Sequence, residues 1–343
     1  MSMTNVLVLE PSRPSTAAER GLQEAFARQA SELPGQGWVT RVRADAMRSF
    51  VARGLPTRRI EEFKYTDLRE RLKETYSPAP SASAVTKAQI DTALGPLAAL
   101  DAFRLVFVNG AFRADLSASV GLAATAELMP LAPLLAKAPA WLEDKFAPGR
   151  LGEETALTSL NTAFMSDGLM LKIKPGQNPG MPVLLVSARS GGEPSAIALR
   201  HVIDMEPGAQ LTLVEAHVAL AGAAPKGLSN TLTDITVADG ASLDHIKCAL
   251  DGAAATHVSN WVAKVGAKVR VMQAYAGGVS ETAPMSSLFS FWGSEPAKPA
   301  APPKAVRPVV KKATPAVAKT TPPPPPPPEV KAAPSAEVSK AAQ

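Results

Sequence analysis

Few residues of this chain could carry chemistry. It has four histidines, His201, His217, His245 and His257, and one cysteine, Cys248. A histidine close to a thiol can bind iron or zinc, and His245 precedes Cys248 by three residues. Residues three apart in a strand face opposite sides of the sheet. We therefore expect both to be packing residues rather than metal ligands.

No known catalytic or metal-binding motif is present in the sequence. The histidines fit none of the HxxxH, HExxH or CxxC spacings, and neither a phosphate-binding P-loop nor the GxSxG motif of hydrolases occurs. The acidic residues form no obvious acid–base pair. We predict a protein that is not an enzyme, with no catalytic residues and no metal ligands. The sequence leaves any cofactor-binding residues unknown.

The chain has 343 residues, and its composition indicates neither a nucleic-acid-binding protein nor a membrane protein. The formal net charge is +5, but residues 296–343 hold eight Lys or Arg against two Glu. The remainder is nearly neutral, so we expect no nucleic-acid surface. The N-terminal residues lack a basic region followed by an apolar stretch of signal-peptide length, and no apolar run of about 18 residues occurs, so we expect neither a signal peptide nor a membrane span. A single cysteine excludes an internal disulfide and fits a cytoplasmic protein.

Residues 1–100 are expected to form a helical region. Thr16 and Glu19 make a capping box ahead of apolar residues at helical spacing. A second helix is predicted from about Thr40 to Arg53, and a shorter one from Thr86. Between them, SPAPSASA at 77–84 has the composition of a linker.

Residues 101–168 are expected to form a mixed α/β connecting region. Asn109-Gly110 within FRLVFVNGAF predicts a β-hairpin, because this dipeptide favours the tight turns that join antiparallel strands. Helices are predicted for 131–146, interrupted by Pro133 and Pro139, and for 155–164.

Residues 169–277 carry a repeat. LKIKPG, IDMEPG, ITVADG and WVAKVG each alternate apolar and polar residues before a glycine. After the last three glycines the chain resumes alike, as GAQLTLVEA, GASLDHIKC and GAKVRVMQA. This alignment matches Trp261 and Ala263 to Ile235 and Val237, and Val269 to Leu243. Repeated strand–turn–strand units bury their apolar faces only when stacked, so the pattern favours an incomplete β-solenoid core. A β-sandwich with similar turns is the alternative.

Residues 278–343 are rich in Pro, Ala and Lys and include seven consecutive prolines at 322–328. Such a composition lacks the apolar residues needed to offset the entropy of ordering, so we predict a disordered tail. The predicted fold class is therefore α+β, with an N-terminal helical region, a β-solenoid core and this tail.

The segment GLPTRRIEEFKYTDLRERL at 54–72 connects two predicted helices. Its glycine and proline end the first helix, and Asp67 with Glu70 predicts a capping box that opens the next. We expect four residues to pack inward, and the charged residues between them to face solvent. The inward set is Ile60, Phe63, Tyr65 and Leu68.

This segment, LTSLNTAF at 157–164 and THVSNWVAKVGAKV at 256–269 resemble the SufD branch of the SufB/SufD family of iron–sulfur cluster assembly proteins. The resemblance runs from about Leu22 to Val269 and implies a β-helical core. It also implies a scaffold subunit of the SUF system that acts with SufB and the ATPase SufC. A transient cluster is then expected only at the level of the complex, and none bound stably by this chain.

After Val269 the chain shows no counterpart of the family's C-terminal part. In the family that part supplies the SufB pairing surface and the SufC docking site, so its loss implies impaired assembly. The alternative interpretation comes from another class: a non-catalytic β-solenoid interaction module with a proline-rich spacer, unconnected to cluster assembly.

Overall fold

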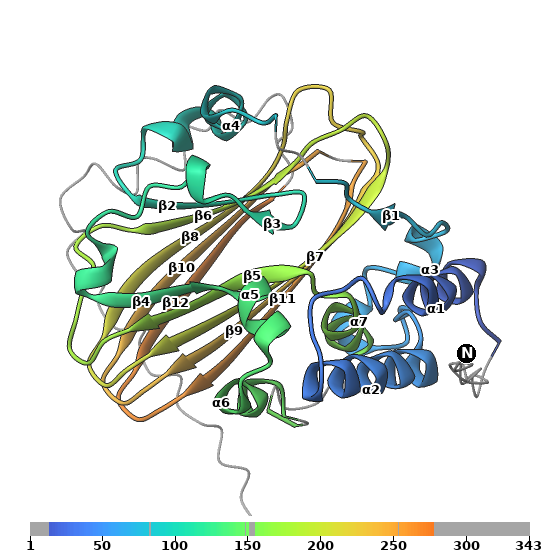
Figure 1. The fold of residues 1–343 in the computed structure, drawn as a ribbon, viewed down its shortest axis with the longest axis horizontal. Helices are drawn as coiled ribbons and strands as arrows, with labels where there is room; N and C mark the ends of the chain where they lie inside the picture. Colours follow the sequence, from blue (N-terminus) through green and yellow to red (C-terminus); the bar gives the residue numbers. More distant parts are fainter. Residues whose placement is uncertain (1–13, 82–83, 148, 151–154, 253, 278–343) are drawn as a thin grey trace, which may run out of the picture. The chain divides into compact units, whose positions relative to one another are not determined.

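The computed structural model describes residues 14–81, 84–147, 149–150, 155–252 and 254–277. The predicted tail lies outside these residues. Within the described part, a group of helices precedes two mainly parallel β-sheets that face each other (Figure 1). The predicted helical region followed by a β-solenoid is confirmed.

The helices begin and end close to the positions that the capping residues indicate. Thr16 and Glu19 form the expected capping box, and matching boxes open the helices after Thr86 and Thr155. The helices are α1 (Ala17–Gln29), α2 (Trp38–Arg53), α3 (Leu68–Arg71), α4 (Lys87–Leu94), α5 (Leu131–Lys137), α6 (Ala140–Glu143) and α7 (Ala156–Phe164). The short 3-10 helices are η1 (Glu61–Phe63), η2 (Gly95–Ala99), η3 (Ala114–Leu116), η4 (Leu122–Ala124) and η5 (Asp144–Phe146).

Each sheet takes alternate strands of the chain. The first has the order β11-β9-β7-β5-β4, with β1 also pairing with β7, and the second has the order β12-β10-β8-β6-β2-β3. The first sheet's strands are β1 (Ser77–Pro78), β4 (Ala126–Pro130), β5 (Asp167–Ile173), β7 (Ser195–Met205), β9 (Gly227–Val237) and β11 (Thr256–Val265). The second sheet's strands are β2 (Phe103–Val108), β3 (Ala111–Phe112), β6 (Val183–Arg189), β8 (Gln210–Ala219), β10 (Ser242–Leu250) and β12 (Arg270–Gly277).

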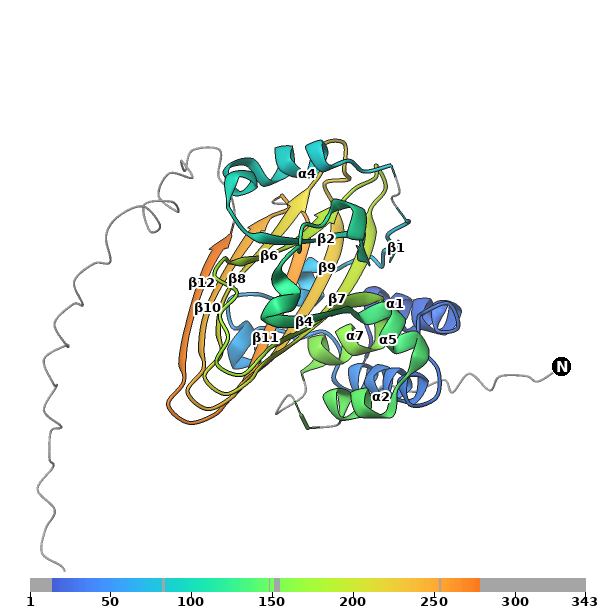
Figure 2. The same ribbon diagram turned by 60° about the vertical axis from the view of Figure 1, so that its left-hand side comes forward.

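The chain crosses from one sheet to the other once per repeat. Four rungs result, β5–β6, β7–β8, β9–β10 and β11–β12, and their strands stack in parallel (Figure 2). A β-sandwich of hairpins would have antiparallel strands, so the solenoid interpretation is correct. The expected hairpin at Asn109-Gly110 also forms, between β2 and β3. The expected linker is partly wrong, since Ser77 and Pro78 pair with β7.

The turns between the two sheets stack as closely as the strands. Gly176, Gly208 and Gly240 have φ of 65°, 70° and 71°, a region that favours glycine. Gly176 and Gly208 each donate a backbone hydrogen bond of 2.9 Å to the turn above. In the fourth rung this position is occupied by Lys268, with φ 55°. The predicted equivalence of Gly266 is therefore wrong by two residues.

The same shift applies to the strands on either side of that turn. Ala263 pairs with Ile235, and Trp261 pairs with Thr233 rather than with Ile235. Val271, not Val269, pairs with Leu243. The last repeat is shorter than the others. Aligning Gly266 with the earlier turn glycines therefore displaced the predicted register of both flanking strands. Because the displacement is even, each side chain keeps the face that the sequence predicted.

Helix α7 attaches the helical region to the first sheet. It packs between α2 and the outer face of strands β7, β9 and β11. Asn161 is fully buried there and donates hydrogen bonds of 2.9 Å to the carbonyl oxygens of Leu199 and Asn230. One side chain therefore joins the helix to two successive rungs.

The segment 54–72 forms the expected joint, but its side chains divide differently. Leu68 is buried and Phe63 packs against the helical core, as predicted. Ile60 and Tyr65 were expected to pack inward and instead are 45% and 87% exposed. The backbone turns at η1, so helical periodicity no longer decides which side chain faces the core. Asp67 caps α3 by accepting from the amides of Arg69 and Glu70.

None of the helices in the described part is long and apolar enough to cross a membrane.

The turn position of Lys268 provides a test of the corrected register. Lys268→Gly should raise the free energy of unfolding by about 1 kcal/mol, because a positive φ strains every residue with a Cβ. Lys264→Gly, in β11 where φ is not positive, should instead lower it. Urea denaturation of the full chain measures both. If Gly266 were the true turn position, Lys268→Gly would not be stabilising.

Candidate functional site: the polar interior of the last rungs

The interior of the solenoid becomes polar from the first rung to the last. Parallel pairing places inward residues of successive rungs in columns. In the second sheet, Leu185 is followed by Glu215 and then Lys247. Beside it, Leu213 is followed by His245. Aliphatic residues of the early rungs are thus replaced, position by position, by ionisable ones.

The first sheet shows the same change on the opposite side of the interior. Leu169 is followed by His201, Thr233 and Trp261 in one column. Toward the glycine turns the interior remains apolar, with Ile203, Ile235 and the other residues of the main core. The polar part therefore occupies the half of the interior that is distant from these turns.

Glu215 is the centre of the polar interior. Its carboxylate accepts a hydrogen bond of 2.8 Å from Thr233 Oγ1 across the gap between the sheets, and lies 3.1 Å from His245 Nε2. Lys247 Nζ lies 2.7 Å from its second oxygen. The lysine approaches outside hydrogen-bond geometry, so this contact is an ion pair rather than a directed bond. All four side chains are at least 97% buried.

The electrostatics of this cluster favour the charged carboxylate. Burial by itself raises the pKa of Glu215, but the attraction of Lys247 and the contacts with the nearby His217 and His245 rings outweigh it. The net pKa lies well below the ordinary value. The Trp261 ring stacks on the His245 imidazole with centroids 5.9 Å apart and covers it from the side of the last rung. The cluster is therefore an enclosed, mutually bonded network.

A second group of polar residues lies beside the first. The rings of His217 and His257 meet edge to face at 4.3 Å, and His257 Nδ1 lies 3.2 Å from Asp251 Oδ2. Burial lowers the pKa of His217 to about 3 and that of His201, in the first sheet beside Thr233, to about 4. Both imidazoles are thus neutral at physiological pH.

The structure separates the two residues that had been considered as a metal pair. His245 faces the interior, whereas Cys248 lies on the opposite face of β10, where burial raises the pKa of its thiol. Among the described residues, no three His, Cys, Asp or Glu side chains are grouped so that they could hold a metal ion. The predictions of no catalytic residue and no metal ligand stay predictions.

Sequence reasoning missed Glu215 and Lys247, although a signal for them was present. In GAQLTLVEA the inward positions are every second residue from Leu211, which places Glu215 inside, and GASLDHIKC places Lys247 there likewise. The alternation read alone would have given two buried charges in adjacent rungs. Their opposite signs are what makes such burial tolerable.

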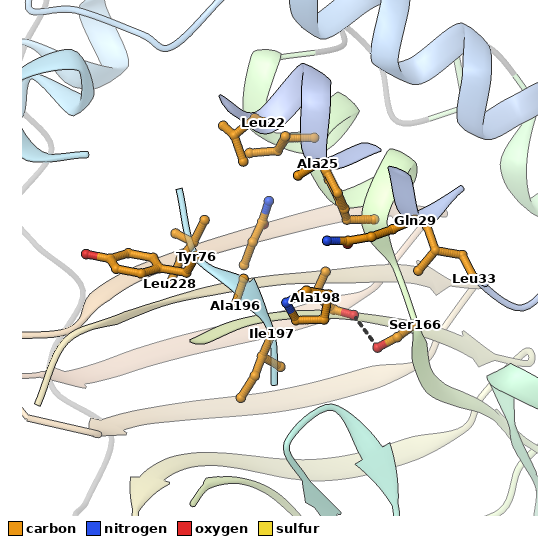
Figure 3. Close-up of a pocket in the computed structure, with 14 residues that line it drawn as sticks. Leu22, Ala25, Gln29, Leu33, Tyr76, Ser166, Ala196, Ile197, Ala198 and Leu228 are labelled. Carbon is orange, nitrogen blue, oxygen red and sulfur yellow. Dashed lines mark hydrogen bonds between the residues drawn. The ribbon is translucent and has the colours of Figure 1, made fainter. Parts of the chain in front are cut away.

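A small cavity between α1 and the first sheet is a weaker candidate. Leu22, Ala25 and Gln29 of α1 face Ala196 and Ala198 of β7 across it (Figure 3). Its volume is about 70 Å³, far below the roughly 300 Å³ at which ligand pockets begin. Ser166 at its edge donates its hydroxyl to the Ala198 carbonyl. We attribute the cavity to imperfect packing at the junction.

Helices followed by an in-register parallel solenoid define the described part as a β-solenoid protein with an N-terminal helical region. The family model "SufBD protein N-terminal region" matches residues 23–183, and "SUF system FeS cluster assembly, SufBD core domain" matches residues 187–287. The chain belongs to the SufB/SufD family of iron–sulfur cluster assembly proteins. The core match continues past Val269, where the sequence resemblance was expected to end.

A curated relative agrees with this assignment. The "Iron-sulfur cluster assembly protein SufD" of Escherichia coli (strain K12) is 28% identical over 211 residues. The alignment covers 60% of this chain and 45% of the relative, so the chain matches less than half of that protein's length.

The buried ion pair generates a prediction with a pH dependence. Lys247→Met should cost about 3–5 kcal/mol of stability, because it leaves the buried Glu215 carboxylate without its cation. In the wild type the low pKa of Glu215 contributes stability that is present above the ordinary carboxyl pKa and lost as the pH falls below it. In the variant burial raises that pKa, so protonation relieves the cost and the deficit should shrink from about pH 8 to about pH 5.

Two further variants control this experiment. Glu215→Gln combined with Lys247→Met should recover most of the loss, because no charge remains buried and the glutamine keeps an acceptor for Thr233. Lys172→Met removes the partly exposed partner of Glu206 and should cost less than about 1 kcal/mol. Urea denaturation at both pH values measures all three. A deficit independent of pH would contradict the assigned ion pair.

Proposed function

We propose that this chain is a scaffold subunit, not an enzyme, of the SUF iron–sulfur cluster assembly system, and that it acts with SufB and the ATPase SufC. The observation that carries the proposal is that both SufBD models match in order along a chain whose described part forms the helical region and the solenoid. A cytoplasmic location fits this role and stays an expectation.

The edges of the solenoid support a role in assembly. Within the described residues, β11 pairs only with β9 and β12 only with β10. Among the described residues the outer N–H and C=O groups of these strands have no strand partner, and such edges are natural sites of pairing. A scaffold that works by joining other subunits requires surfaces of this kind.

The chemistry of the interior supports a non-enzymatic role with no stably bound cofactor. Glu215 accepts a hydrogen bond from Thr233, contacts His245 and forms an ion pair with Lys247, all within the chain, and the four side chains are buried. The one thiol, Cys248, is buried on the other face of β10 with a raised pKa, which disfavours the thiolate that binds iron. We therefore place any transient cluster at the level of the complex, where other subunits can supply ligands.

The alternative, an interaction module unconnected to cluster assembly, is disfavoured by membership of the SufB/SufD family. The expected impairment concerns residues after Val269. Residues 278–343 lie outside the described part, so the impairment stays a prediction.

Co-expression of the full chain with SufB and SufC, followed by affinity purification, tests the proposed partners. We expect both SufB and SufC to be recovered below stoichiometry, SufC the more weakly, because the resemblance offers neither the SufB pairing surface nor the SufC docking site after Val269. An unrelated bait with the same tag is the control. Recovery of neither partner would favour the unconnected module, and stoichiometric SufC would show the expected impairment to be wrong.

Anaerobic reconstitution with iron and sulfide tests the proposal on cofactors. The purified chain should show no visible absorption band that depends on its thiol, and Cys248→Ala should give the same spectrum as the wild type. Reconstituted SufB is the positive control for the procedure. A stoichiometric cluster in the wild type that is lost in Cys248→Ala would overturn this part of the proposal.

A further inference from the structure

The buried side chain of Glu19 holds segment 54–72 in one conformation. This carboxylate is 94% buried and accepts hydrogen bonds of 2.7 Å from the amides of both Thr16 and Leu55. It also lies 3.1 Å from the Arg69 guanidinium. A single buried charge therefore joins the start of α1 to both ends of the segment.

The segment is closed on itself as well. The amide of Leu68 donates a hydrogen bond of 3.0 Å to the Pro56 carbonyl, which brings the two ends of the loop together. Phe63 and Leu68 anchor it in the helical core. A surface loop that is already fixed loses little conformational entropy on binding, which favours recognition.

On this fixed loop two large apolar side chains point to solvent. Ile60 is 45% exposed and Tyr65 is 87% exposed. Lys64 Nζ lies 5.4 Å from the centre of the Tyr65 ring, so the ring is partly covered by a cation rather than by the core. Nothing in the fold of the described residues requires apolar side chains at these two positions.

Beside these residues the surface is hollowed and basic. The hollow has a volume of about 700 Å³ and is open to solvent. It is lined by five cationic and two acidic side chains together with Ile60 and other neutral residues. The charged lining residues are Arg53, Arg58, Arg59, Arg69, Lys73, Asp67 and Glu70. No ion pair within the described part engages Arg58 or Arg59, and both are exposed.

We infer that this hollow binds an acidic, extended segment of another protein, with Arg58 and Arg59 pairing its carboxylates and Ile60 contacting one of its apolar side chains. The excess of cations selects an anionic partner. The exposed Ile60 adds a contact that the phosphate backbone of a nucleic acid cannot use and that an apolar side chain of a peptide can. A protein segment therefore fits better than a nucleic acid. The inference does not depend on the partners proposed above.

Fluorescence anisotropy with the full chain tests this site. The probe is a dye-labelled peptide of about ten residues, mostly Glu and Asp with one central Leu. Arg58→Glu combined with Arg59→Glu should weaken its binding by roughly tenfold or more and reduce the dependence on salt. Ile60→Ser should weaken it by roughly threefold, as expected for a half-exposed aliphatic side chain.

Two control variants distinguish binding in the hollow from nonspecific electrostatic or hydrophobic binding elsewhere on the surface. Arg71→Glu changes the same charge on an exposed residue of α3 that does not line the hollow. Val120→Ser removes an apolar side chain that is 98% exposed elsewhere. Neither should change the dissociation constant, and thermal unfolding should show every variant folded.

Three outcomes would overturn the inference. The first is equal binding by the wild type and the Arg58/Arg59 double variant. The second is equal affinity for a counterpart peptide with Gln and Asn in place of the acids. The third is tighter binding of a single-stranded oligonucleotide that the same variants abolish, which would assign the hollow to nucleic acid.

Discussion

Parallel, in-register stacking is the constraint on which the rest of this structure depends. Each inward residue lies directly against its counterpart in the next rung, so the interior is a set of columns rather than a freely packed core. A substitution in one rung therefore changes the environment of the same position in two others. This is why the passage from Leu185 to Glu215 to Lys247 produces a buried ion pair and not two isolated charges.

Buried charge of this kind is a poor way to stabilise a protein, since desolvation of the two groups offsets much of their attraction. The network around Glu215 limits the cost because Thr233 from the opposite sheet and His245 from the next rung both contact its Oε1. The apolar half of the interior, around Ile203 and Ile235, supplies the burial that the polar half lacks. One half of the interior thus supplies apolar burial, and the other holds the polar network, within the same rungs.

Much of the fold could be predicted because local signals and stacking agree. Gly176, Gly208 and Gly240 mark the turns, and the capping boxes at Thr16, Thr86 and Thr155 mark the helices. The prediction failed where a local signal misled: Gly266 imitates a turn glycine, while the true turn residue is Lys268. Ile60 and Tyr65 were misplaced because polarity alone does not reveal that a loop is fixed from beneath by a distant residue such as Glu19. The candidate site could not be predicted in this way, because it depends on the pairing of residues between rungs, which no single sequence segment reveals.

The attachment of α7 has a consequence for the order of events during synthesis. The two carbonyl groups that Asn161 engages belong to residues 38 and 69 positions further along the chain. At roughly 10 residues per second, Asn161 is synthesised about seven seconds before its second acceptor. During that interval α7 lacks its partners in β9 and β11, while the other N-terminal helices can already pack with it. The face of these helices toward the solenoid is therefore completed late, when the third and fourth rungs are made.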